Sequence, residues 1–61
     1  MMNAGEKVRE FRAKKGMTQG DFAKYAGIST PTVQKIEKGI DVSLLIASKI
    51  AKALGVEFQS L

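Results

Sequence analysis

The fold is decided by the stretch GMTQGDFAKYAGIS at residues 16–29. Thr18 followed by Asp21 has the spacing of a helix N-cap with a reciprocal carboxylate, so a helix is expected to begin here. Gly27 supplies the left-handed residue that commonly ends a helix, and Ser29, only two residues later, is a good cap for the next one. The stretch therefore predicts two helices joined by a very tight turn.

The residues before and after this stretch extend the helical pattern. Asn3 with Glu6 resembles a capping box, which predicts a first helix over residues 4–15, ended by Gly16. At the other end of the chain, an apolar tail predicts one more helical turn; it consists of Val56, Phe58 and Leu61. No alternating run is long enough to predict a strand.

Two further helices lie between these ends. Pro31 suits the first turn of the helix that Ser29 caps, because its missing N–H is unpaired there anyway, and Gly39 closes that helix. Ser43 begins the last long helix and Gly55 ends it. The positions expected to be buried recur at helical spacing: Phe22, Ala23, Ala26, Val33, Ile36, Leu44, Ala47, Ile50, Ala51 and Leu54. We expect an all-α fold of five helices in a single domain, residues 1–61.

The composition excludes most catalytic chemistry. The 61 residues include no His and no Cys. Zinc sites of the usual type, cysteine nucleophiles, disulfides and His-based acid/base pairs are therefore absent. We expect no enzyme, no metal and no cofactor. The apolar runs are far shorter than the roughly 20 residues that span a bilayer, and the N-terminus lacks a signal pattern, so an intracellular protein without a membrane segment is expected.

The positive charge of the chain is local. The formal net charge is +4, but from Lys7 to Lys38 eight cationic side chains stand against three acidic ones, while the residues from Gly39 onward are balanced. Such asymmetry indicates a polyanion as partner. It is equally compatible with Lys and Arg side chains that simply solvate helix faces.

Two helices with a tight glycine turn and a cap at each start form a helix-turn-helix. Together with Val33, the run IEKG at residues 36–39 and the run IAKALGV at residues 50–56, the stretch resembles the phage repressor/Cro helix-turn-helix family (XRE family) over about residues 7–58. The resemblance implies a compact lambda-repressor-like domain with five helices, in which the second and third form the helix-turn-helix. It implies sequence-specific binding of double-stranded DNA by a small transcriptional regulator.

The resemblance also implies how the DNA is bound. The recognition helix, about residues 29–38, would enter the major groove, and a homodimer would bind a near-palindromic operator. The protein would be bacterial or phage-encoded, cytoplasmic and associated with the nucleoid. The base-reading positions of the family fall on Ser29, Thr30, Pro31 and Lys35. Pro31 departs from the usual polar residue and leaves at most an apolar contact there, which places more of the specificity on Thr30 and Lys35.

Phosphate contacts and a structural brace are implied in the same way. The phosphate-binding positions fall on Gln19, Thr32, Gln34 and Lys38. Gln19 is also expected to brace the first residue of the recognition helix. Arg12 and Glu37 occupy the positions of a partly buried ion pair that ties the first helix to the end of the third.

The loop of residues 39–43 departs most from the family, since it carries no Lys, Arg or Pro. Ile40 and Val42 are therefore either buried or exposed between two subunits, and we expect at least one of them at a dimer contact.

Two other functions stay open. The same fold serves antitoxins and protein-interaction adaptors, for which a stoichiometric protein partner without salt-dependent DNA binding is expected. A membrane-surface or nonspecific polyanion binder would instead depend equally on Lys24 and Lys35.

Overall fold

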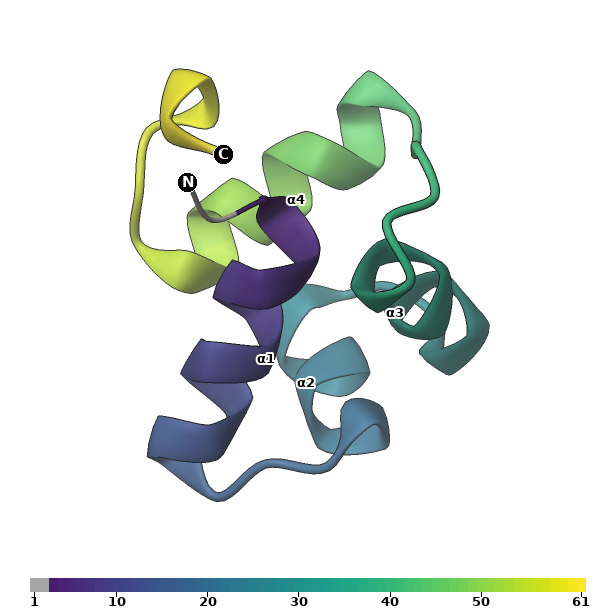
Figure 1. Cartoon of the computed structure of the whole chain (residues 1–61), viewed down its shortest axis with the longest axis vertical. Coiled ribbons are helices and arrows are strands. Elements are labelled where there is room, and N and C mark those ends of the chain that lie inside the picture. The colour runs from purple at the N-terminus through teal and green to yellow at the C-terminus, as the bar shows by residue number, and fades with distance from the viewer. Residues whose placement is uncertain (1–2) are drawn as a thin grey trace.

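The computed structural model describes residues 3–61, which contain four α-helices and one short 3₁₀ helix and no strand. Their bounds are α1 Ala4–Lys15, α2 Gln19–Ala26, α3 Thr30–Glu37, α4 Leu44–Leu54 and η1 Phe58–Ser60. The helices fold around one centre, with α4 crossing the upper part of the view in Figure 1. The all-α class is confirmed, and no helix within the described residues is long and apolar enough to cross a membrane.

The expectation of a fifth α-helix at the C-terminal end is wrong. The apolar tail forms only a three-residue 3₁₀ turn, whose backbone bonds run from Ser60 N to Glu57 O and from Leu61 N to Phe58 O. Its N-cap, Glu57, makes no side-chain hydrogen bond to the turn. A short segment without a cap cannot offset the cost of nucleating an α-helix, so residues 3–61 contain four α-helices.

The predicted starts of the four α-helices are confirmed because each has a capping side chain. The cap accepts a hydrogen bond from the backbone N–H three residues further on in every case; the caps are Asn3, Thr18, Ser29 and Ser43. Gly27, at φ 74°, ends α2 in the left-handed region that favours glycine. Local signals thus set both ends of α2, and the turn between α2 and the cap of α3 consists of Gly27 and Ile28.

The core draws one large side chain from each α-helix. Val8, Phe22, Val33 and Ile50 are each less than 2% exposed, and full burial of such side chains is worth about 1.5–3 kcal/mol apiece. Smaller buried residues and partly buried apolar side chains complete the cluster around them. The helices are too short to be stable alone, so this shared core holds them at fixed angles.

One predicted core residue, Leu44, lies outside the core and is 75% exposed. The inward side of α4 carries Ile46, Ile50 and Leu54, which follow one another at four-residue spacing and pack into or against the core. Leu44 precedes Ile46 by two residues, or about 200° around the helix, so it points to the opposite side. The apolar pattern of α4 is therefore wider than its buried stripe.

The start of α1 packs directly on the end of α3. A Cβ added at Gly5 would lie 2.3 Å from the carbonyl oxygen of Ile36 and 3.0 Å from the Cα of Glu37. Only glycine allows the two backbones to approach so closely. This contact brings the last turn of α3 beside α1 and positions the polar residues described next.

Candidate nucleic-acid interface

The outer surface of α3 is a polar stripe. Pro31, Gln34, Lys35 and Lys38 are all exposed and follow one another at spacings of three, one and three residues, which is one side of a helix. The opposite side is buried through Val33, Ile36 and Glu37. Because that side is anchored in the core, the outer stripe is held at a fixed orientation relative to α2.

The hydroxyl groups at the start of α3 are less free than the stripe. Ser29 Oγ accepts from Thr32 N at 3.2 Å and lies 2.6 Å from Thr32 Oγ1, so both side chains take part in the cap. Thr30 is half-buried, and its Oγ1 lies 3.8 Å from where a Cβ at Gly20 of α2 would stand. Among the base-reading candidates, Pro31 and Lys35 are therefore the two that protrude without an internal bond to another described residue.

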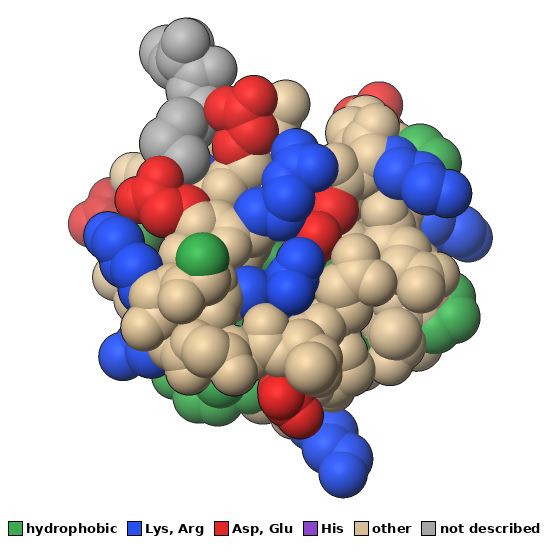
Figure 2. Space-filling view, turned by 60° about the horizontal axis from the view of Figure 1, so that its bottom comes forward, with side chains coloured by type: hydrophobic (Ala, Val, Ile, Leu, Met, Phe, Trp, Pro, Cys, Tyr) green, Lys and Arg blue, Asp and Glu red, His purple; other side chains and the backbone are tan. Residues whose placement is uncertain are grey.

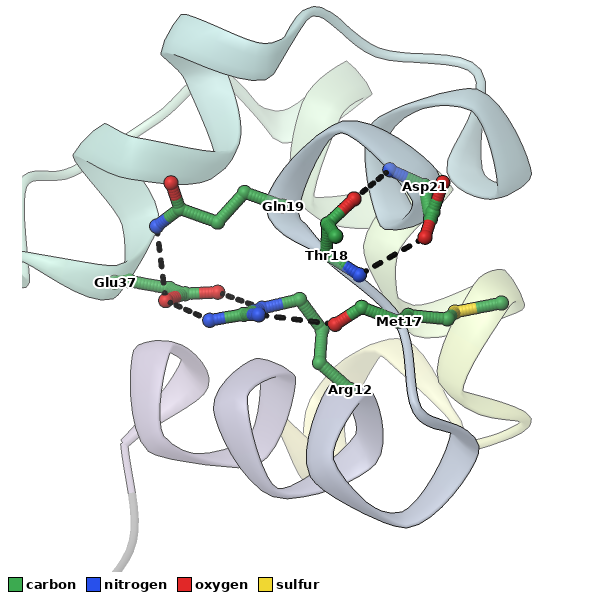
Figure 3. Close-up of polar contacts among 6 residues, drawn as sticks. All are labelled: Arg12, Met17, Thr18, Gln19, Asp21 and Glu37. Carbon is green, nitrogen blue, oxygen red and sulfur yellow. Dashed lines mark hydrogen bonds and ion pairs between the residues drawn. The ribbon is translucent and has the colours of Figure 1, made fainter.

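A network of polar side chains joins α1, α2 and the end of α3 (Figure 3). Arg12 Nε donates to Glu37 Oε2 at 2.7 Å and Arg12 Nη2 donates to Glu37 Oε1 at 2.9 Å, a two-point pairing of guanidinium and carboxylate. Arg12 Nη1 also donates to the carbonyl oxygen of Met17 at 3.1 Å. The same guanidinium thus holds the end of α3 and the loop between α1 and α2.

Gln19 completes this network at a different place from the one expected. Its Nε2 donates to Glu37 Oε1 at 3.2 Å, so it contacts the last turn of α3 and not the first residue of that helix. Gln19 is the first residue of α2, directly after the cap Thr18, and is half-buried. The bond leaves its second amide hydrogen and its carbonyl oxygen available at the start of α2.

The buried carboxylate of Glu37 is kept charged by these neighbours. Glu37 is 8% exposed, and burial alone would raise the pKa of its carboxyl group. Hydrogen bonds from Arg12 and Gln19, with the positive charges of Arg12 and Arg9, outweigh the burial and set the pKa of Glu37 below its ordinary value. The hydrogen bond to Glu37 raises the pKa of Arg12, so both partners of the pair are held in their charged forms.

Arg9 is the functional candidate that the sequence interpretation missed. It is exposed on α1, and its charge acts on Glu37 at the end of α3. Its spacing from Arg12, three residues along the same helix, is the signal that would have indicated a shared face. Arg9 therefore adds a positive charge that acts on the last turn of α3, and it forms no ion pair with any residue from 3 to 61.

The positive charge does not form one continuous field. On the face shown in Figure 2, Lys and Arg side chains are spread over several places, with acidic side chains between them. Lys14 pairs with Glu10 at 3.4 Å and Lys15 lies 5.7 Å from the centre of the Phe11 ring, both on α1. Part of the local cationic excess is therefore engaged away from α3.

The two apolar residues of the loop between α3 and α4 differ in burial. Ile40 is 51% exposed, whereas Val42 is half-buried and packs against the core. Leu44 and Leu45, at the start of α4, are 75% and 66% exposed. Ile40, Leu44 and Leu45 form what we call the loop patch.

Three comparisons place this geometry among known proteins. The family model described as Helix-turn-helix (HTH_3) matches residues 8–61. An uncharacterised HTH-type transcriptional regulator of Methanocaldococcus jannaschii is 45% identical over 56 residues, which are 90% of this chain and 85% of that one. The crystal structure of the restriction-modification controller protein C.AhdI from Aeromonas hydrophila superposes with a TM-score of 0.73 at 35% identity, covering 92% of this chain and 83% of that one.

A longer relative shows the same domain within a larger protein. An HTH-type transcriptional regulatory protein of Archaeoglobus fulgidus is 44% identical over 50 residues, which are 82% of this chain and only 16% of that protein. The helix pair α2–α3, with its outward polar stripe, defines a helix-turn-helix DNA-binding protein. The chain belongs to the XRE-type helix-turn-helix family, and it is a DNA-binding regulator of transcription.

Proposed function

We propose that this regulator reads a specific DNA sequence with the outer stripe of α3 in the major groove. The observation that carries the proposal is the stripe itself, four exposed residues on a helix whose opposite side is anchored in the core. An α-helix fits the B-DNA major groove, which is about 12 Å wide. The eight residues of α3 extend over roughly 12 Å, enough for a few base pairs.

Lys35 carries most of the base reading in this proposal. Its ammonium group can donate to O6 and N7 of guanine. Pro31 contributes an apolar contact such as one to a thymine methyl group. Ser29 caps α3 and Thr30 lies close to α2, which limits how far both side chains can reach. In this proposal they contact the DNA only where the start of α3 points into the groove.

The backbone of the DNA is contacted by residues within the stripe and beside it. We assign phosphates to Gln34 on α3 and to Lys38 at its C-cap, to the free amide hydrogen of Gln19, and to Thr32 as a hydroxyl donor. Arg9 adds a cation whose charge acts on Glu37 at the end of α3. Such contacts orient the helix without reading sequence. Arg12 acts as a brace, because Glu37 and Met17 occupy its guanidinium group.

A homodimer on a near-palindromic operator completes the proposal. One domain of this size offers a modest DNA interface, and two linked recognition helices one helical turn apart gain affinity together. The loop patch supports a contact between subunits, because three exposed apolar residues lie close together in the chain. Ile40 is exposed in this loop, whereas Val42 is half-buried. The function needs no cofactor, metal or catalytic step and takes place on intracellular DNA.

Selection of binding sites from a random pool of duplex DNA tests the proposal. We expect a motif with two half-sites about 10 base pairs apart. Lys35→Ala should relax the selection at one position per half-site by about 1–3 kcal/mol, whereas Lys38→Ala should weaken all sites alike and reduce the salt slope by about 1. Lys14→Ala, an exposed change on α1, is the control. An unstructured pool, or equal effects of Lys35→Ala and Lys14→Ala, would refute the proposal.

A further inference from the structure

A hollow lies between the C-terminal end of α2 and the later half of α4. Its volume is about 470 Å³, and its lining includes Lys24, Tyr25, Lys49, Lys52 and Ala53. None of its lining residues belongs to α3. The DNA-binding stripe and this hollow are therefore built from different residues, and we call it the lysine hollow.

The charge around the lysine hollow is positive and only partly offset, since Lys24 acts electrostatically on Asp21 of α2. Lys24, Lys49 and Lys52 are exposed, and none of them forms an ion pair with any residue between 3 and 61. The whole of α4 contains no acidic residue. The acidic residue of α2 is Asp21, whose carboxylate is bonded to the backbone N–H of Thr18.

Lys49 is held in place at the rim. Its Nζ donates to the carbonyl oxygen of Gly27 at 3.3 Å, at the end of α2 where the helix dipole is negative. That single bond leaves two of its three hydrogens free. Lys49 therefore offers an oriented donor, while the exposed Lys24 and Lys52 have no side-chain hydrogen bond to another described residue.

The floor of the lysine hollow is apolar. The ring of Tyr25 is stacked on Phe11 with centroids 5.8 Å apart and planes at 25°, yet Tyr25 remains 58% exposed. Ala26 and Ala53 line the hollow beside it with small side chains. A supported aromatic ring next to small residues leaves space for an apolar side chain of a partner.

We propose that the lysine hollow docks an acidic peptide segment of a partner protein, one that also carries an aromatic or aliphatic side chain. The carboxylates of such a segment complement the three lysines, and its apolar side chain covers Tyr25 and Ala53. Charge alone would give little affinity, because exposed ion pairs are individually weak. The apolar floor makes a mixed acidic and apolar segment a better occupant than a nucleic acid backbone.

The test uses the full chain and two synthetic peptides of equal charge. The first is a twelve-residue peptide of Glu with three interspersed Phe and Leu residues, and the second replaces those three by Ser. Amide chemical shifts of the ¹⁵N-labelled chain should change near residues 24–27 and 49–53, and the first peptide should bind several-fold more tightly than the second.

Matched charge variants separate the lysine hollow from general positive charge. Lys24→Gln with Lys52→Gln should weaken binding of the first peptide by about fivefold, the effect of two exposed ion pairs. Lys14→Gln with Lys15→Gln removes the same charge on α1 and should change it less than about twofold. Thermal melts of both double variants establish that they are folded.

Three results would overturn the proposal. Equal weakening by the two double variants would show nonspecific attraction, and equal binding of the two peptides would show that the apolar floor is not used. A loss of DNA affinity confined to the Lys24→Gln, Lys52→Gln variant would assign the lysine hollow to the duplex instead. Each result is independent of whether α3 reads sequence.

Discussion

Removing Glu37, the more buried partner of the Arg12–Glu37 pair, should strongly destabilise the domain. The carboxylate is 8% exposed and accepts three hydrogen bonds, two from Arg12 and one from Gln19. Breaking a buried ion pair by removing one partner typically costs about 3–5 kcal/mol. Because the Arg12 side chain is 20% exposed and keeps its bond to Met17, we expect about 3 kcal/mol for Glu37→Ala, at the lower end of that range.

This loss is large compared with the total stability of so small a domain. At about 0.05–0.15 kcal/mol per residue, 61 residues give a free energy of unfolding of about 3–9 kcal/mol. Glu37→Ala should therefore be partly unfolded at the lower end of this range. Glu37→Gln keeps the size of the side chain and removes the charge, so it serves as the milder variant if the alanine variant does not fold.

A double-mutant cycle measured by urea unfolding at pH 7 separates the pair from its surroundings. Arg12→Ala should also cost about 3 kcal/mol, since it leaves a buried carboxylate with only Gln19 as hydrogen-bonding partner. The double variant should cost less than either single one, because it leaves no buried charge without its partner, which gives a coupling energy above about 3 kcal/mol. Small additive losses, each below about 1 kcal/mol, would refute the reasoning because they are typical of an exposed pair.

The wild-type chain and Arg12→Ala should differ in the sign of the pH dependence that Glu37 contributes to stability. In the wild-type chain the pKa of Glu37 is lowered, so its stabilisation is present above the unfolded pKa and is lost as the pH falls through the folded pKa. In Arg12→Ala, burial is opposed only by Gln19 and Arg9, so we expect the pKa of Glu37 to be raised and stability to be lost as the pH rises from the unfolded pKa through the folded one. The urea midpoints of the wild-type chain and of Arg12→Ala, measured between pH 3 and pH 7, should therefore move apart as the pH approaches neutral. Parallel curves of midpoint against pH for these two proteins would contradict the role of Arg12 in keeping Glu37 charged.

Further predictions concern the helix contacts and the cap of α2. Gly5→Ala should cost about 1–3 kcal/mol in urea unfolding, because its Cβ would meet the Ile36 carbonyl oxygen, whereas Gly20→Ala, which has room, should stabilise by up to about 1 kcal/mol. Equal effects of the two would contradict the close approach of α1 and α3. Thr18→Ala should cost about 1 kcal/mol by the same measurement. Hydrogen bonds from Thr18 lower the pKa of Asp21, so acidification should destabilise this variant less than the wild-type chain.

The helices were predictable because their signals are local. Each start has a side-chain cap and α1, α2 and α4 end at a glycine, so neighbouring residues were sufficient to locate them. The apolar tail has no comparable cap, and the sequence pattern overestimated its helical content. Leu44 fits the apolar spacing of α4, but which side of a helix is buried depends on the helices packed against it.

The site was predictable only as a set of positions, since its bonds depend on packing. The bonds from Arg12 to Glu37 require α1 to approach the last turn of α3, and that approach depends on Gly5, which carries no local signal for it. The spacing of Gln19 and Glu37 in the chain, eighteen residues, says nothing about their contact. The lysine hollow likewise requires α2 and α4 to lie together.

The distribution of charge shows how packing changes the meaning of a sequence count. In the chain, Lys24 belongs to the basic segment and Lys49 and Lys52 to the balanced one, yet the three meet at one hollow. Arg12 is paired within the fold and Lys14 lies on α1 beside Glu10, so neither adds freely to the field around α3. The cations left at α3 are few, and DNA recognition must therefore depend more on the fixed orientation of that helix than on the net charge of the domain.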